Sequence, residues 1–272
     1  MGLLASVPAH AQPVEKPLFE LGIGAGAAVL PDYPGSSQYH FYALPVPTFV
    51  YRGKLLRADE RGVRGLFYQG PRAELDVSLG GAVPVSSDDN DARRGMPDLD
   101  WMGEIGPSLR LGLWRPAQNR RLDVDLNLRS VFSTDLSSVS YRGIVAAPEI
   151  AWRQGDLLKD GSRLRLAVGP IFATEEYMSY FYEVQDRYAR PDRPAYSARA
   201  GYVGSRLQGS YRFPVTARFS LFAGARVDLL YGATNADSPL FRSDVNGAVL
   251  IGAAYSLYQS SQTVTLPGTL EN

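Results

Sequence analysis

The stretch RLDVDLNLRSVFS, residues 121–133, alternates between polar or ionised side chains and apolar ones. Leu122, Val124, Leu126 and Leu128 occupy every second position, and acidic, amide or basic side chains fill the positions between them. Successive side chains of a β-strand point to opposite faces, so this period of two predicts a strand with one apolar face and one charged face.

The same alternation recurs along most of the chain. Clear repeats occupy residues 72–83, 104–114, 163–172 and 218–231, and weaker ones occupy 20–30, 39–51, 144–152, 202–213 and 249–257. Pro45 and Pro47 predict that the strand over 39–51 is distorted or short, because proline cannot donate to a strand ladder. Residues 55–68 fit one bent strand or a short hairpin. With a hairpin there the total is about twelve strands, and roughly 10 to 14 would fit the pattern.

Three features of these strands favour a membrane environment. Charges occupy consecutive inward positions, as in Asp123, Asp125 and Arg129, and the strands have the length of about 10 residues that a tilted strand needs to cross a bilayer. Aromatic residues fall near strand ends, as in an interfacial girdle; they are Tyr39, Tyr51, Tyr68, Trp101, Trp114, Trp152 and Tyr231. The sequence therefore predicts an all-β fold, a closed antiparallel transmembrane β-barrel. A soluble barrel or sandwich is the alternative.

The connections and the chain ends give the domain organisation. Short connections (69–71, 115–120, 154–162, 214–217) alternate with long ones (86–100, 174–197, 233–246), as periplasmic turns and external loops do. Ala9-His10-Ala11 has the form of a signal-peptidase site. We expect a signal-peptide remnant over residues 1–11, the outer-membrane barrel over 12–258, and a polar C-terminal tail over 259–272.

Composition excludes several function classes. With 28 basic and 28 acidic residues the chain has no positive surplus for a nucleic acid, and without Cys it has neither disulfides nor thiolate zinc sites. Only His10 and His40 could act as a histidine base, and His10 falls in the expected signal segment. Asp88, Asp89 and Asp91 lack the bidentate Glu of a calcium loop. We therefore expect no enzyme activity, metal or cofactor.

The charged strand faces predict a set of ionised side chains that project into one lumen. They could form a salt-bridge network that fixes strand register, or line a small polar pore with some charge preference. The residues are Arg72, Glu74, Asp76, Glu104, Arg110, Asp123, Asp125, Arg129, Arg163, Arg165, Arg206, Arg226 and Asp228.

The long connection over 175–193 combines aromatic residues with charges. Its aromatic side chains are Tyr177, Tyr180, Phe181, Tyr182 and Tyr188. Such a segment could fold into the barrel mouth as a plug or form a contact surface for a partner. The aromatic ends of two extended strands would have the same composition.

Three further stretches carry a family resemblance. They are PDYPGS at 31–36, LPVPTFVYRG at 44–53, and GMPDL at 95–99 followed by EIGPS at 104–108. Their order resembles the MipA/OmpV family, the MltA-interacting proteins of Gram-negative outer membranes, from about Phe19 to Tyr258. Such chains usually end on an aromatic residue of the last strand, whereas here a polar extension follows Tyr258. Either this extension is a disordered appendage or the last strand is placed wrongly.

The resemblance implies a barrel in outer-membrane lipid that acts as a scaffold between peptidoglycan enzymes, a lytic transglycosylase and a bifunctional synthase of the penicillin-binding class. Some family members are described as surface adhesins or as porin-like proteins, so a channel for small polar solutes and an adhesin are the alternatives. The family offers no catalytic residues to carry over.

Overall fold

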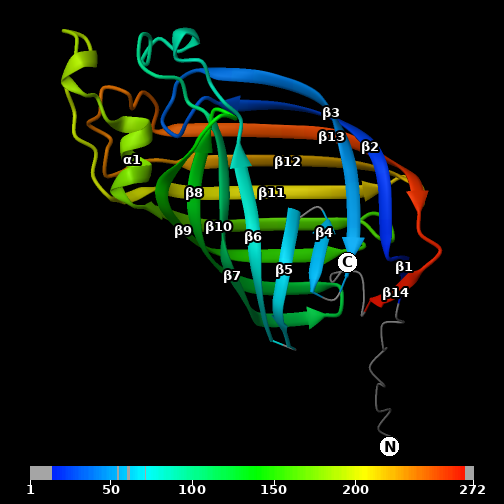
Figure 1. Cartoon of the computed structure of the whole chain (residues 1–272). Helices are drawn as coiled ribbons and strands as arrows, with labels where there is room; N and C mark the ends of the chain where they lie inside the picture. Colours follow the sequence, from blue (N-terminus) through cyan, green and yellow to red (C-terminus); the bar gives the residue numbers. More distant parts are fainter. Residues whose placement is uncertain (1–13, 54, 60–61, 71, 267–272) are drawn as a thin grey trace, which may run out of the picture.

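A computed structural model describes residues 14–53, 55–59, 62–70 and 72–266. Twelve strands of this part form one closed antiparallel barrel, as the sequence predicts (Figure 1). The strands are β2 (Phe19–Pro31), β3 (Tyr39–Arg52), β4 (Leu56–Asp59), β5 (Gly62–Gln69), β6 (Ala73–Ala82), β7 (Trp101–Ala117), β8 (Arg120–Thr134), β9 (Val139–Gly155), β10 (Arg163–Ala173), β11 (Gly201–Pro214), β12 (Phe219–Leu229) and β13 (Val245–Gln259). The expected signal-peptide remnant lies outside the described residues.

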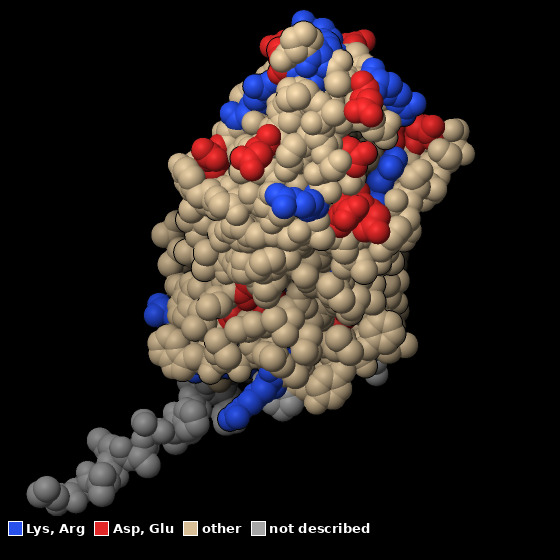
Figure 2. All heavy atoms as spheres, turned by 90° about the vertical axis from the view of Figure 1, so that its left-hand side faces the viewer, with Lys and Arg blue, Asp and Glu red and all other residues tan. Residues whose placement is uncertain are grey.

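The orientation of the strand faces is that of a membrane barrel. On β8 the side chains of Leu126 and Leu128 are 41% and 49% exposed on the outside, whereas Asp123 and Asp125 are buried in the interior. On the face shown in Figure 2, a broad belt that is mostly uncharged crosses the molecule, and charged side chains gather mainly at the loop end above it. This belt is the surface that a bilayer covers.

Strand β3 differs from its prediction. We expected Pro45 and Pro47 to distort or shorten it, but β3 extends over 14 residues and pairs with β2 without a register shift from Tyr39 to Tyr51. Both prolines share the outward face with Phe41 and Phe49. The strand tolerates them because odd-numbered residues of β3 point their backbone nitrogens away from β2. On that side β4 pairs only with Tyr51 and Arg52, so the two prolines interrupt no strand ladder in the described chain.

The segment over 55–68 is a short hairpin, and this gives the even strand count. Strand β4 pairs with β3 only through Tyr51 and Arg52, and β5 pairs with β6 from Arg64 to Gln69. The wall between β3 and β6 is therefore lower than the rest of the barrel.

Strands β13 and β2 close the barrel with small side chains. Ala253 lies opposite Ala25, Gly252 opposite Gly26, and Ala254 opposite Gly24. At these three pairs the backbones of the first and last barrel strands are separated by little side-chain volume.

The first and last described strands pair with each other and are not part of the barrel. Strand β1 (Val14–Pro17) pairs antiparallel with β14 (Thr263–Leu266) as a separate two-stranded sheet. Strand β13 is the last barrel strand, and the described part of the polar tail contains β14. This sheet lies on the side of the short turns, which is the periplasmic side in outer-membrane barrels.

The other end of the barrel holds the long connections. Helix α1 (Glu175–Tyr182) follows β10, and the short 3-10 helices η1 (Ser87–Asp89) and η2 (Asp186–Tyr188) lie in two of the loops. Figure 1 shows α1 at the mouth of the barrel, beside the ends of β8 to β11. In the described part of the chain, no helix has the length and apolar character needed to cross a membrane.

Candidate functional site

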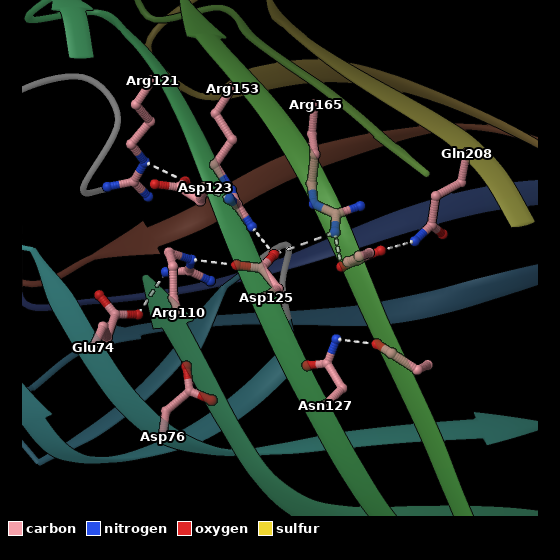
Figure 3. Close-up of polar contacts among 12 residues, drawn as sticks. Glu74, Asp76, Arg110, Arg121, Asp123, Asp125, Asn127, Arg153, Arg165 and Gln208 are labelled. Carbon is pink, nitrogen blue, oxygen red and sulfur yellow. Dashed lines mark hydrogen bonds and ion pairs between the residues drawn. The ribbon is translucent and has the colours of Figure 1, made fainter. Parts of the chain in front are cut away.

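Six of the predicted luminal charges (Glu74, Asp76, Arg110, Asp123, Asp125, Arg165) lie in a continuous network of ion pairs on β5 to β10, here called the central charge cluster. Asp125 lies at its middle: it accepts a hydrogen bond from Arg110 at 3.1 Å, pairs with Arg153, and has Arg165 at 3.5 Å. Arg110 also reaches Glu74 at 2.7 Å. Figure 3 shows these side chains pointing toward one another across adjacent strands.

The central charge cluster is electrically balanced. Five arginines (Arg64, Arg110, Arg121, Arg153, Arg165) are joined by ion pairs to five carboxylates (Glu74, Asp76, Asp123, Asp125, Glu149). Removing these groups from water is costly, and attraction offsets that cost only where geometry and hydrogen bonding are good. Direct pairing between neighbouring strands supplies both, and it also fixes which residue lies opposite which.

Two smaller clusters lie nearer the loop end. Arg129 of β8 bonds the hydroxyl of Ser78 at 3.1 Å and reaches Glu104 at 3.3 Å. Arg206 of β11 donates two hydrogen bonds to the carboxylate of Asp228 on β12, at 2.6 and 3.0 Å. Arg226 lies 3.6 Å from the same carboxylate. These groups also belong to the predicted set.

Two members of the predicted set lie elsewhere. Arg72 is exposed in the short connection before β6 and is not part of the clusters, because it precedes the first residue of the strand. Arg163 begins β10 at the periplasmic end, directly opposite Arg212 of β11.

The sequence prediction also missed residues that belong to the central charge cluster. Arg153 fell one residue beyond the expected end of its strand, and β9 in fact continues to Gly155. Glu149 was in phase with Arg153 but lies beside Pro148, in a strand with weak alternation. Arg64 lies in the hairpin region, where strand phase was ambiguous. Arg121 lies on the polar face of residues 121–133, so its charge and its phase in the alternation could have identified it.

A hydrophobic cluster, here called the plug, lies at the loop end of the barrel. Met178, Phe181 and Tyr182 of α1 are buried against Val131 of β8 and Ile171 of β10, with further apolar residues from the loops. Of the predicted aromatic residues, Tyr177, Tyr180, Phe181 and Tyr182 lie in or against this cluster, in a helix and not in extended strands. Tyr188 lies apart, beside a second small cluster around Leu240.

Tyr177 faces the luminal charges from the plug. Burial raises the pKa of its hydroxyl above the ordinary value, Glu104 raises it further, and Arg206 and Arg226 lower it. The hydroxyl is therefore protonated at neutral pH and lies within electrostatic reach of the two smaller clusters. The apolar side chains of the plug are therefore in direct succession with the charged side chains of the lumen.

The turn over residues 31–36 is the centre of the loop cap, which consists of α1 and the loops 32–38, 83–100, 183–200 and 230–244. Asp32 accepts a hydrogen bond from Asn90 at 2.6 Å, and Tyr33 donates to the carbonyl of Leu240 at 2.7 Å. Tyr182 donates to the carbonyl of Pro34 at 2.9 Å. One short turn thus holds three other segments of the cap.

The motif at residues 95–99 belongs to the same cap. Arg93 is buried and donates to the carbonyls of Pro97 and Phe181, at 3.0 and 3.3 Å. Asp98 accepts a hydrogen bond from the backbone of Ser87 at 2.6 Å. This loop is therefore fastened both to itself and to α1.

His40 has a structural partner. Its Nδ1 lies 2.5 Å from Asp32, within the same turn-centred network. Among the described residues no hydroxyl is hydrogen-bonded to His40, so the arrangement of a histidine base with a nucleophile is not formed here.

The lumen contains one large cavity, of about 800 Å³. One wall is charged and includes Arg110, Asp125 and Arg165, while the opposite wall includes Phe222 and Leu250. The cavity extends to Arg212 at the periplasmic end, below the plug.

The family model described as "MltA-interacting protein MipA" matches residues 23–257. The chain belongs to the MipA family. The match covers every strand of the barrel in whole or in part, and the three motifs described above fall within it. Family and fold together place the chain in the outer membrane of a Gram-negative bacterium. No curated protein matches this chain.

Solved structures with a similar fold share little sequence with this MipA-family barrel. The NanC porin is 9% identical, with 88% of this chain and 100% of that chain covered and a TM-score of 0.36. The outer membrane phospholipase A from Escherichia coli is 11% identical, with 93% and 94% covered and a TM-score of 0.36. The outer membrane channel DcaP of Acinetobacter baumannii is 11% identical, with 93% and 100% covered and a TM-score of 0.35.

Proposed function

We propose that this MipA-family barrel is a non-enzymatic outer-membrane scaffold whose periplasmic end docks peptidoglycan enzymes. The family description names MltA as a partner of MipA, and we take the partner here to be a lytic transglycosylase of that kind. A penicillin-binding synthase would join the same assembly as the second enzyme. The barrel anchors them in the outer membrane, next to the peptidoglycan that they modify.

The observation that carries this proposal is the asymmetry between the two ends of the barrel. The outer end is filled by the plug and fastened by the loop cap, whereas the periplasmic end carries the β1·β14 sheet. That sheet has only two strands, so each strand has an outer edge with no partner strand in the described chain. An exposed sheet edge can accept an extended segment of another protein by backbone hydrogen bonding.

Co-purification tests the docking site directly. The full-length protein, extracted in mild detergent, is incubated with a purified lytic transglycosylase, and the retained enzyme is measured. The variant Thr265→Pro removes a backbone donor from β14, opposite Glu15, and we expect it to lose retention by about tenfold or more. Ser261→Pro lies in the bend before β14 and serves as the matched control. Equal retention by wild type and Thr265→Pro would remove the sheet as the docking site, and no retention at all would remove the scaffold proposal.

A porin-like channel is the second candidate, because the cavity of about 800 Å³ occupies the lumen and is lined partly by charges. The plug argues against free passage. Planar-bilayer recording distinguishes the two functions, since a channel gives discrete conductance steps and a scaffold with a closed outer mouth gives none. An adhesin would act through the loop cap, and removal of the cap would then abolish adhesion without affecting retention of the transglycosylase.

A further inference from the structure

The luminal cavity extends from the plug to the periplasmic end of the barrel. At one end it is lined by Ile171, which belongs to the plug, and at the other by Ala217 and Arg218, in the turn between β11 and β12. Short connections of this kind lie on the periplasmic side. Ala217 and Arg218 are both exposed, so the cavity approaches solvent at this end.

One wall of the cavity belongs to the central charge cluster, whose charges are already compensated. Each of its five arginines lies within ion-pair distance of at least one of its five carboxylates. An ionised ligand that bound one member would have to take it from its present partner, and would leave that partner buried without compensation. An uncharged ligand can use the remaining lone pairs and N–H groups without breaking a pair. This wall therefore favours an uncharged ligand over an ionised one.

Uncharged amide side chains border the central charge cluster and also line the cavity. Asn127 of β8 donates from its amide nitrogen to the carbonyl of Ala147 at 3.1 Å, and Gln208 of β11 donates to Glu149 at 2.8 Å. Figure 3 shows both amides beside the charged side chains. Among the described residues neither amide oxygen accepts a hydrogen bond. Each can therefore accept one from a ligand.

Two hydroxyl groups lie next to these amides. Ser108 of β7 is directly opposite Asn127, and Ser210 is the next inward residue after Gln208 on β11. In the described part of the chain neither hydroxyl has a hydrogen-bond partner. We call these four side chains, from β7, β8 and β11, the neutral polar set. Each of them has hydrogen-bonding capacity that the protein itself does not use.

The opposite wall of the cavity is apolar and carries an aromatic ring. Phe222 of β12 lies over Gly252 of β13, where an added Cβ would be only 2.2 Å from the ring. This ring and Leu250, which is 42% exposed, both line the cavity. Apolar groups in contact with water are unfavourable, and a ligand with an apolar face would cover them. C–H groups with partial positive charge also pack well on the negative face of an aromatic ring.

A glycine keeps space open beside this apolar wall. Gly224 of β12 lines the cavity, between Ser210 of β11 and Leu250 of β13 in the strand register. A Cβ at Gly224 would have only ordinary contacts, 3.7 Å from the carbonyl oxygen of Gly209 and 4.0 Å from the Cβ of Leu250. A larger side chain at this position would therefore occupy the cavity without displacing the backbone.

We propose that the lumen binds an uncharged sugar of disaccharide size, which enters from the periplasm. A sugar ring has hydroxyl groups around its edge and C–H groups on its faces. The hydroxyls would bind the neutral polar set, and one face would cover Phe222 and Leu250. The cavity of about 800 Å³ lies within the size range of small-ligand sites. This binding does not depend on the proposed docking of enzymes at the β1·β14 sheet.

Saturation-transfer NMR of the full-length protein in deuterated detergent tests the proposal with three disaccharides of similar size. Cellobiose is uncharged, the glucosamine dimer carries two protonated amines in slightly acidic buffer, and digalacturonate is anionic. We expect transfer to cellobiose with millimolar affinity. Both charged dimers should bind about tenfold more weakly or less, because their charges compete with existing ion pairs.

Two glycine variants locate the site. Gly224→Phe fills the cavity and should abolish transfer to cellobiose. Gly103→Phe is the matched control, because Gly103 lies on the outer face of β7 with no atom within 4 Å of an added Cβ, and it should leave transfer unchanged. Asn127→Ala should weaken cellobiose binding by about fivefold, the effect of one hydrogen bond. Asn119→Ala removes an amide in the turn after β7 and is the control for Asn127→Ala.

Absence of transfer to all three sugars would overturn the proposal. Undiminished transfer with Gly224→Phe would overturn it as well, since binding would then lie outside the lumen. Equal binding of the charged and uncharged dimers would overturn the selection of an uncharged ligand. If Gly224→Phe does not show the gel shift of a folded barrel, Ala254→Phe, which lines the same cavity, replaces it.

Discussion

Replacing Asp125 with Asn should destabilise the barrel far more than the loss of an exposed ion pair does. The carboxylate of Asp125 is only 4% exposed and is shared by Arg110, Arg153 and Arg165. Removing one partner of a buried ion pair costs about 3–5 kcal/mol, because the remaining charge is left buried without compensation. Each of these arginines keeps a second carboxylate, however: Glu74 for Arg110, Asp123 for Arg153 and Glu149 for Arg165. We therefore expect the lower end of that range, a loss of about 3 kcal/mol in the free energy of unfolding.

The measurement is urea unfolding of the protein in lipid vesicles, followed by the gel shift between folded and unfolded forms. Asp91→Asn is the matched control, because Asp91 also pairs with an arginine, Arg94 at 2.6 Å, but both side chains are more than half exposed. Such a surface pair contributes about 0–1 kcal/mol. If Asp125→Asn and Asp91→Asn lower the free energy of unfolding equally, the central charge cluster does not hold the barrel in the way described.

Three further predictions concern the loop cap, the plug and the edge of β3 that carries Pro45 and Pro47. Burial raises the pKa of Tyr33 to about 12, so the protonated hydroxyl that bonds Leu240 stabilises the cap fully below pH 10 and loses this effect as the pH rises through about 12. Protease cleavage of the cap loops should rise over that interval, and the rise should be smaller in Tyr33→Phe; identical pH profiles would contradict this. Phe181→Ala leaves a cavity that costs about 3–5 kcal/mol locally and should produce conductance steps in a planar bilayer, whereas an unchanged flat trace would show that the plug is not the seal. Replacing Pro45 and Pro47 together by Thr restores two edge donors, and dimers that survive mild detergent should then appear on gels; a purely monomeric variant would argue against the role given to these prolines.

The fold could be read from the sequence because the period-two pattern is local. Each strand shows its own alternation, as in residues 121–133. This alternation arises whenever the two faces of a strand lie in different environments. The side on which the charges lie followed from the same pattern, since lipid cannot solvate Asp123 or Asp125. Strand ends were less accurate, as with Arg153, because alternation fades where a strand leaves the membrane.

The particular ion pairs could not be predicted. Alternation places Arg110 and Asp125 on the same side of the wall, but only the register between β7 and β8 brings them opposite each other. Helix α1 was also missed as a helix, because a segment of 8 residues gives little periodicity and its packing against Val131 and Ile171 comes from distant strands. The role of Pro45 and Pro47 depends on a missing neighbour, which a single strand cannot reveal.

The small side chains where β13 meets β2 have a consequence for how the barrel is assembled. Most ion pairs of the central charge cluster join strands that follow one another in the chain, so each newly added strand can neutralise charges of the previous one. The first and last strands must wait until the whole chain has been made. The centre of their junction, from Gly24 to Gly26 of β2, consists of alanine and glycine, so this part can pair without removing water from a charge or rearranging a bulky side chain.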